Sequence, residues 1–480
     1  MKTWPSPIAR LALIATAAYL LAVPVVLVGI DGWSGYDLAR LLQWPVLLLA
    51  AAAAAATTSQ VTHRPPQIPV VLLVALMAAA IPSVVLSPVP AMALREAAVM
   101  TGLLTLATLI ARERSLHQAL MGISSVAAGA YALLITGLAT TVTLAGETVS
   151  RLDLFVGYDN HRFYSHVLTA AIPLTLAALH ASNGRLGRHL ARGSLVLLGM
   201  MLFATGGRGT MLALAGAVAF VFCRMGRRAW PTFAPLAYGM GLGAVFFALL
   251  FVWPSLADSN GGTALADYGV ARLTSDQSRL PLWKHAMDLA RASPWFGAGP
   301  MHFAHGHNPI AAAPHSLPLQ IAAEWGLPML ALVVAIIGIV LRQLWRRLGA
   351  SVDAKDPGIA LSMGFVAVLL DSFVAGNFNV PMSQVWIAVL LGLFWAWLRQ
   401  PYASRQLARN ATGAPGAPAS GQAKRFSMAR AAAVSVAVLQ VWLGTQMLPE
   451  AAHIGDHLRQ VMKAFPTDRH QPRFWSHGRF

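Results

Sequence analysis

The chain has 480 residues, of which 56% are hydrophobic and 11% charged, and its mean hydropathy is +0.59. Soluble domains carry about 25% charged residues, so this composition excludes an ordinary soluble protein and places most of the chain in lipid. The single cysteine, Cys223, excludes an intrachain disulfide and a cysteine-based metal cluster.

Uncharged apolar stretches recur along the whole chain. Each has about 20 residues, the length that crosses a hydrocarbon core of about 30 Å. We predict an all-α fold, a polytopic transmembrane helical bundle of about 12 to 13 spans with one large periplasmic loop domain. The expected spans lie near residues 8–30, 38–58, 68–88, 91–111, 118–146, 163–181, 193–206, 209–223, 232–253, 317–341, 358–376, 382–398 and 429–448.

The formal net charge of +17 comes from basic residues that fall in every second loop between these spans. Such loops include residues 185–192, 224–228 and 342–355, whereas the alternate loops 31–37 and 147–162 are acidic or balanced. This is the cytoplasmic bias of basic residues that orients membrane proteins. It predicts a multi-pass protein of the bacterial inner membrane, whose partner is the lipid bilayer and not nucleic acid.

Two polar regions and the C-terminus interrupt the apolar pattern. The segment from Trp253 to Ser316 has about 60 residues, which is too long for a connector, and residues 400–430 form a basic Gly/Pro/Ala-rich linker. The histidines of residues 450–480 fit no standard metal motif. We expect an N-terminal transmembrane bundle (1–255), a periplasmic loop domain (256–316), core transmembrane helices (317–398), a flexible cytoplasmic linker (399–428) and an extra transmembrane helix with a periplasmic tail (429–480).

The residues best suited to chemistry lie between Arg279 and Glu324. Arg279 and Trp283 are four apart and share a helix face. His315 comes just before a helix that carries Gln320 and Glu324 one turn apart. His315 alone is also compatible with a solvated loop histidine, and Glu324 with a carboxylate that holds the loop by hydrogen bonds. A carboxylate just inside an apolar helix is nevertheless costly unless it is paired or functional.

Arginines at the expected outer ends of other spans extend this set. A lone arginine there is usually an interfacial anchor, but Arg208 lies between glycines and against the charge bias, which suits the close approach of an anionic headgroup. Guanidinium groups bind phosphate oxygens bidentately and stay charged. We therefore expect a diphosphate pocket made by Arg162, Arg208, Arg272 and Arg279.

Four segments together resemble a known family. They are RFYSH from Arg162, TGGRGTMLAL around Arg208, R-x-x-x-W with SPWFGAGP after Arg279, and HSLPLQIAAEWGLP from His315. Their order over residues 155–400 resembles that of the O-antigen ligase and polymerase superfamily of membrane glycosyltransferases. The chain differs from the family in having Ser316 where an asparagine is usual, and in its extra span and tail.

The resemblance implies transfer of a glycan from undecaprenyl diphosphate to an acceptor hydroxyl at the periplasmic face, with inversion and with no metal or cofactor. The acceptor favoured is the lipid A core. A general base and fixed cations fit this chemistry. The implied catalytic residues are His315, Arg279 and Arg208, and the implied substrate-binding residues are Arg162, Arg272, Trp283, Gln320 and Glu324.

Alternatives remain open at this point. Within the superfamily, the chain could be an O-antigen polymerase or a protein O-oligosaccharyltransferase. Outside it, a transporter or lipid flippase would place charged groups at mid-membrane. Asp371 is the candidate for such a group, but it lies toward the outer end of its expected span. A non-catalytic scaffold would leave the outward-facing arginines unexplained.

Overall fold

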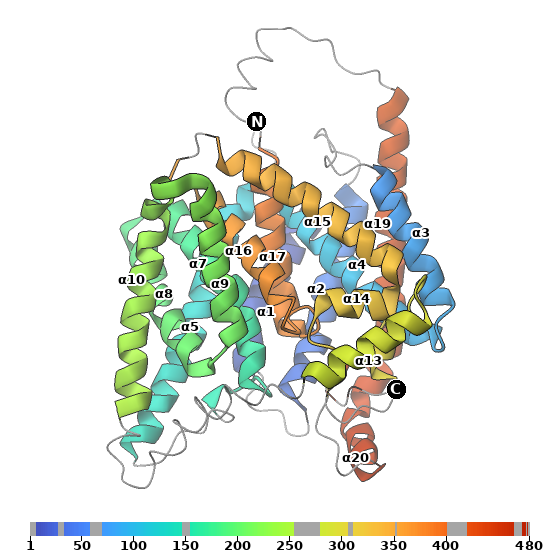
Figure 1. Cartoon of the computed structure of the whole chain (residues 1–480), viewed down its shortest axis with the longest axis horizontal. Coiled ribbons are helices and arrows are strands. Elements are labelled where there is room, and N and C mark those ends of the chain that lie inside the picture. Colours follow the sequence, from blue (N-terminus) through green and yellow to red (C-terminus); the bar gives the residue numbers. More distant parts are fainter. Residues whose placement is uncertain are drawn as a thin grey trace.

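The computed structural model describes residues 6–26, 33–57, 70–145, 154–253, 279–305, 311–350, 353–400, 420–464, 473–476 and 478. Helices dominate these residues and no strand occurs among them, which confirms the all-α fold (Figure 1). The first half contains α1 (Pro7–Val26), α2 (Gly35–Thr57), α3 (Val70–Val85), α4 (Pro90–Arg112), α5 (His117–Leu144), α7 (His161–Ala181), α8 (Arg185–Thr205), α9 (Arg208–Met225) and α10 (Trp230–Phe247). The second half contains α13 (Arg279–Ala292), α14 (Leu317–Trp325), α15 (Leu327–Leu348), α16 (Pro357–Asp371), α17 (Pro381–Leu398), α19 (Ser420–Ala452) and α20 (Ile454–Ala464).

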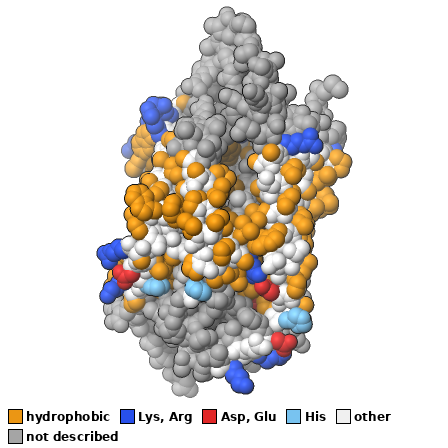
Figure 2. Space-filling model, turned by 90° about the vertical axis from the view of Figure 1, so that its right-hand side faces the viewer, with side chains coloured by type: hydrophobic (Ala, Val, Ile, Leu, Met, Phe, Trp, Pro, Cys, Tyr) orange, Lys and Arg blue, Asp and Glu red, His pale blue; other side chains and the backbone are white. Residues whose placement is uncertain are grey.

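The lengths and compositions of these helices suit a membrane. The described residues contain 8 stretches that are long and apolar enough to cross one, and three shorter apolar helices. Figure 2 shows a band of hydrophobic side chains across the middle of the face in view, with charged side chains mostly above and below it. The polytopic helical bundle is therefore confirmed. The span expected near 193–206 is not among the long apolar stretches, since α8 begins at Arg185 and its first turns are basic.

The single helix expected over residues 317–341 is wrong. The structure has α14 and α15 instead, separated at Gly326. Gly326 has φ +89°, which favours glycine, and Pro328 occupies the start of α15. As a result α14 is a helix of 9 residues, and the span itself begins at Leu327.

The centre of the bundle is formed by α7 and α17, the most buried of the candidate spans, whereas α15 is the least buried. The helix α16 packs against α7, α9 and α17. Helices α13 and α20 lie toward one end of the bundle, and α14 packs against α13 nearer the middle (Figure 1). We call the end with α13 and α20 the α13 end. The basic last turn of α15, with Arg346 and Arg347, lies at the opposite end.

Only part of the expected loop domain 256–316 lies within the described residues, because residues 254–278 and 306–310 fall outside them. The described part consists of α13, a turn and a short 3-10 helix at His302–Ala304. A small apolar cluster of Leu282, Ala286, Phe303 and Ala323 packs α13 against α14. The polar segment of the sequence is thus anchored to the bundle through α14.

Candidate active site

His315 lies where α13, the start of α14 and the segment between α16 and α17 meet. Its backbone has φ +51°, a left-handed conformation that costs a non-glycine residue about 1–2 kcal/mol. The Nε1 of Trp283 donates a hydrogen bond to the carbonyl of Pro314 at 3.1 Å. On the other side, the backbone N of Leu317 donates to the carbonyl of Ser372 at 2.8 Å. The fold therefore holds His315 in a costly conformation, and such strain clusters at functional sites.

Two of the predicted arginines act on His315. Arg162 lies in the first turn of α7, where the side chain of Asn160 caps the helix by accepting from the Arg162 backbone N at 2.9 Å. Arg279 is the first residue of α13. Burial, and after it the positive charges of Arg162 and Arg279, lower the pKa of His315 from 6.5 to about 4. The imidazole is therefore neutral at pH 7, the form that accepts a proton.

The glycines beside Arg208 allow close packing at the α13 end. A methyl group on Gly207 would lie 2.8 Å from the Cβ of Ser165, and one on Gly209 would lie 3.4 Å from Oδ1 of Asp371. The first turn of α9 therefore rests against both α7 and α16, with the Arg208 side chain exposed. The fourth predicted arginine, Arg272, lies outside the described residues.

His166 and Asp371 were not predicted as site residues. The Nδ1 of His166 lies 3.9 Å from Oδ2 of Asp371, which also accepts a hydrogen bond from Oγ1 of Thr169 at 3.0 Å. His166 is within electrostatic reach of Arg162, Arg279 and His315. A signal for His166 was present in the sequence, because it follows Arg162 by four residues and so shares its helix face.

Gln320 and Glu324 hydrogen-bond to protein groups. The Nε2 of Gln320 donates to Oε2 of Glu324 at 3.2 Å, and the amides of Gln320 and Asn379 exchange hydrogen bonds of 3.2 and 3.0 Å. The backbone N of Phe303 donates to Oε1 of Glu324 at 3.2 Å. These contacts tie α14 to segment 372–380. They agree with the loop-holding alternative for Glu324, while contact of Gln320, Glu324 or Trp283 with substrate stays a prediction.

The segment SPWFGAGP forms a turn that packs against the C-terminal end of α14. The backbone N of Ala298 donates to the carbonyl of Ala323 at 2.8 Å, and that of Gly299 donates to the carbonyl of Glu324 at 3.0 Å. The last carbonyls of a helix lack hydrogen-bond donors within the helix. Here the backbone N–H groups of the turn are the donors. The short helix next to His315 is thus fixed at both ends, by Ser372 at its start and by the turn at its finish.

Substitution of Gly376 tests whether the position of the imidazole matters. A methyl group there would lie 3.0 Å from Nδ1 of His315, so the ring must shift in Gly376→Ala. We expect about a tenfold lower rate of the site's reaction with little loss of thermal stability. The rate and melting temperature should be compared with those of Gly338→Ala, where the added methyl group meets open space. Equal rates for the two variants would contradict the expectation.

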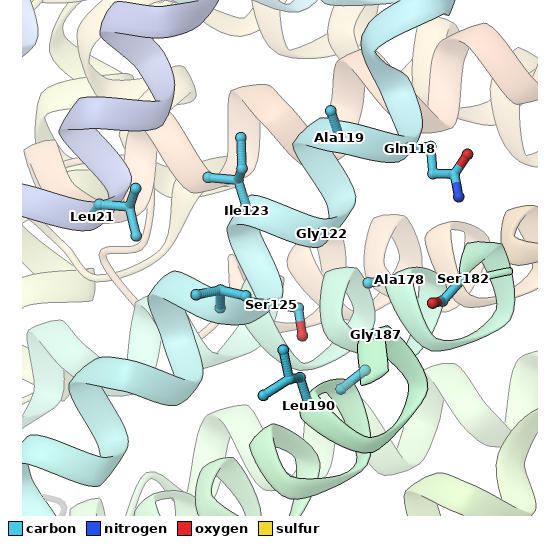
Figure 3. Close-up of a pocket in the computed structure, with 12 residues that line it drawn as sticks. Leu21, Gln118, Ala119, Gly122, Ile123, Ser125, Ala178, Ser182, Gly187 and Leu190 are labelled. Carbon is cyan, nitrogen blue, oxygen red and sulfur yellow. The ribbon is translucent and has the colours of Figure 1, made fainter. Parts of the chain in front are cut away.

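A pocket elsewhere in the molecule has a different character. It lies between α1, α5, α7 and α8, where α5 begins and α7 ends, and none of the residues that line it is ionisable (Figure 3). Its polar groups are those of Gln118, Ser125 and Ser182. Because acid–base chemistry needs titratable groups, the candidate active site is the cluster around His315 and not this pocket.

Part of the chain is similar to known proteins. Residues 193–334 match the family model described as O-Antigen ligase. The O-antigen ligase of Pseudomonas aeruginosa is 24% identical over 220 residues, which cover 44% of this chain and 48% of that protein. The resemblance to the O-antigen ligase and polymerase superfamily is confirmed. The alignment spans about half the length of that ligase.

The ligase-like region 193–334 contains most of the predicted site. Arg208, Arg279 and His315 lie within it, whereas Arg162 and His166 on α7 precede it. The structure brings α7 and the ligase-like region together, since Arg162 on α7 and Arg279 on α13 both lie within electrostatic reach of His315.

Proposed function

We propose that this protein is a membrane glycosyltransferase of the O-antigen ligase type. It transfers a glycan from a polyprenyl diphosphate donor to an acceptor hydroxyl, with lipid A core as the favoured acceptor. The observation that carries the proposal is the placement of His315, a neutral imidazole in a strained backbone conformation, beside the positive charges of Arg162 and Arg279.

The reaction can be written with these groups. The imidazole of His315 accepts the proton of the acceptor hydroxyl, and the oxygen attacks the anomeric carbon of the donor. The bond from that carbon to the diphosphate oxygen breaks, and the diphosphate leaves with the electron pair. Attack opposite to the leaving group inverts the anomeric carbon. Arg279, Arg162 and Arg208 would stabilise the departing anion, so the mechanism requires no metal.

Donor binding would also strengthen the base. Arg162 and Arg279 depress the pKa of His315 because their charges oppose its protonation. A diphosphate bound to these arginines offsets their charge and so removes part of the depression, while burial, the largest cause of the low pKa of His315, remains. The base is therefore stronger when the donor is bound. In the empty site, the low pKa of His315 suppresses proton uptake.

The orientation of the site supports the periplasmic face of the inner membrane. The basic loops 185–192 and 342–355 mark the cytoplasmic side by the charge bias. The second of these loops includes the basic end of α15, which lies at the opposite end of the bundle from α13 (Figure 1). The candidate active site therefore faces the periplasm in this proposal.

Reconstitution tests the function directly. The full chain in liposomes would receive an undecaprenyl diphosphate-linked glycan, with lipid A core, a second lipid-linked glycan or an acceptor protein supplied in separate reactions. We expect a glycosidic product on lipid A core, with the rate unchanged by a chelator. Product only on the second glycan or only on protein would favour a polymerase or a protein O-oligosaccharyltransferase. Movement of the donor across the bilayer without any product would favour a flippase.

A further inference from the structure

The C-terminal segment Arg473–Ser476 is inserted into the α13 end of the bundle. Arg473, Phe474, Trp475 and Ser476 are all buried, and Arg473 is only 2% exposed. The sequence predicted this region as a periplasmic tail and assigned it no role. Burial of an arginine is costly unless its charge is matched.

Arg473 meets two buried carboxylates and an amide. Its Nη2 lies 2.6 Å from Oε2 of Glu324 and 3.8 Å from Oε1 of Glu96 on α4, and its Nη1 donates to Oδ1 of Asn379 at 3.3 Å. Among the ion pairs of the described residues, Arg473 is the only cation paired with Glu324 or Glu96. Without it, both carboxylates would be buried with no cation in the described contacts.

The residues after Arg473 fix the segment to the bundle. The ring of Phe474 lies 5.4 Å from the guanidinium carbons of both Arg40 and Arg95. The backbone N and the Oγ of Ser476 donate to the two carboxylate oxygens of Asp37 at 2.6 and 2.5 Å.

Two further contacts involve this segment. The Nε1 of Trp475 donates to Oε2 of Glu450 at 2.9 Å, and the hydroxyl of Tyr36 donates to the carbonyl of Arg473. Such a set of directed contacts indicates one specific docking geometry.

Arg473 joins the two elements that flank His315. Through Glu324 it holds α14, whose first residue follows His315 by two positions. Through Asn379 it holds segment 372–380, whose Gly376 packs against the imidazole. Gln320 completes this hydrogen-bond network, since it hydrogen-bonds to both Glu324 and Asn379. The guanidinium is thus the cross-link between the two walls of the site.

We propose that Arg473 is a positioning residue of the active site, which sets α14 and segment 372–380 in the relative position that His315 needs. The C-terminal segment is then a component of the catalytic centre. This inference rests on the glycan transfer proposed above.

Three substitutions in the full chain test the role. In Arg473→Met the buried charge of Glu324 loses its cation, and we expect a kcat at least tenfold lower, with the KM for the lipid-linked donor within threefold. Arg473→Lys keeps the charge and should retain an intermediate rate. Glu324→Gln combined with Arg473→Met removes the unpaired charge of Glu324 but leaves the cross-link to Asn379 absent. It should therefore be more stable than Arg473→Met, because a neutral amide needs no cation, while its kcat stays at least tenfold below that of wild type. Arg459→Met is the matched control, since Arg459 forms an exposed pair with Asp456 on α20.

A second measurement does not depend on turnover. Hydrogen–deuterium exchange of the α14 amides should rise in Arg473→Met and stay at the wild-type level in Arg459→Met. If wild type transfers no glycan, the proposed function fails, while the exchange result still decides the role of Arg473. Unchanged α14 exchange in Arg473→Met would overturn the inference. So would a lower melting temperature with an unchanged kcat, because that pattern is a purely structural effect. If Arg473→Met does not fold, the double variant takes its place: a folded double variant with kcat at least tenfold below wild type supports the inference, and one that transfers at the wild-type rate overturns it.

Discussion

Replacement of His315 by asparagine should lower the rate of glycan transfer by about a hundredfold to ten-thousandfold, the range in which a general base contributes. Asparagine tolerates the left-handed backbone that His315 adopts at φ +51°, so His315→Asn removes the base while it leaves the backbone unstrained. The donor KM should change little, because the arginines that hold the diphosphate remain. The measurement is kcat in the reconstituted system.

His189→Asn is the control, since His189 is exposed on α8 and plays no part in the site. It should transfer at the wild-type rate. A kcat of His315→Asn within tenfold of wild type would remove the general base from the proposed mechanism. Loss of transfer in His166→Asn together with its retention in His315→Asn would assign the base to the pair of His166 and Asp371.

The sequence predicted the bundle, and it singled out the residues of the candidate site, because both features leave local signals. The length of the apolar stretches predicts the spans. The polar residues Arg208 and His315 differ in character from their neighbours in the sequence. The interruption at Gly326 also had a signal in the order Gly-Leu-Pro, but the apolar composition on both sides suggested one continuous helix. Helix propensity alone cannot distinguish a continuous span from a short helix followed by one.

The partners of these residues could not be predicted from spacing. Arg473 and Glu324 are 149 residues apart along the chain, and their pairing at 2.6 Å is set by the packing of the whole α13 end. Asp371 stood out as a charge in an apolar helix, yet only the fold shows that His166 and Thr169 are its neighbours. Long-range contacts between buried polar groups therefore carry the information that local patterns lack.

Replacement of Arg279 by glutamine should have two separable effects, because Arg279 both faces the diphosphate in the proposed mechanism and depresses the pKa of His315. Loss of a fixed donor to the leaving group should lower kcat at pH 7 by about a hundredfold to a thousandfold. Burial is the largest cause of the low pKa of His315, and it remains together with the charge of Arg162, so loss of the Arg279 charge should raise that pKa by only part of its depression from 6.5. The profile of kcat/KM against pH measures both effects.

The direction of the second effect follows from the form of His315 that reacts. Only the neutral imidazole accepts a proton, so the rate falls as the pH drops through the pKa. In wild type this fall lies near pH 4, whereas in Arg279→Gln it should lie at a somewhat higher pH, because burial and Arg162 still lower the pKa. The ratio of the two rates should therefore grow as the pH is lowered toward 4. Arg279→Lys keeps the charge but not the bidentate geometry, so its rate should fall while its acid limb stays in place. Arg291 lies on the same helix in an exposed pair with Asp288, so Arg291→Gln should change neither kcat at pH 7 nor the position of the acid limb. An acid limb that is the same in Arg279→Gln and wild type would show that the base is not the histidine that Arg279 faces.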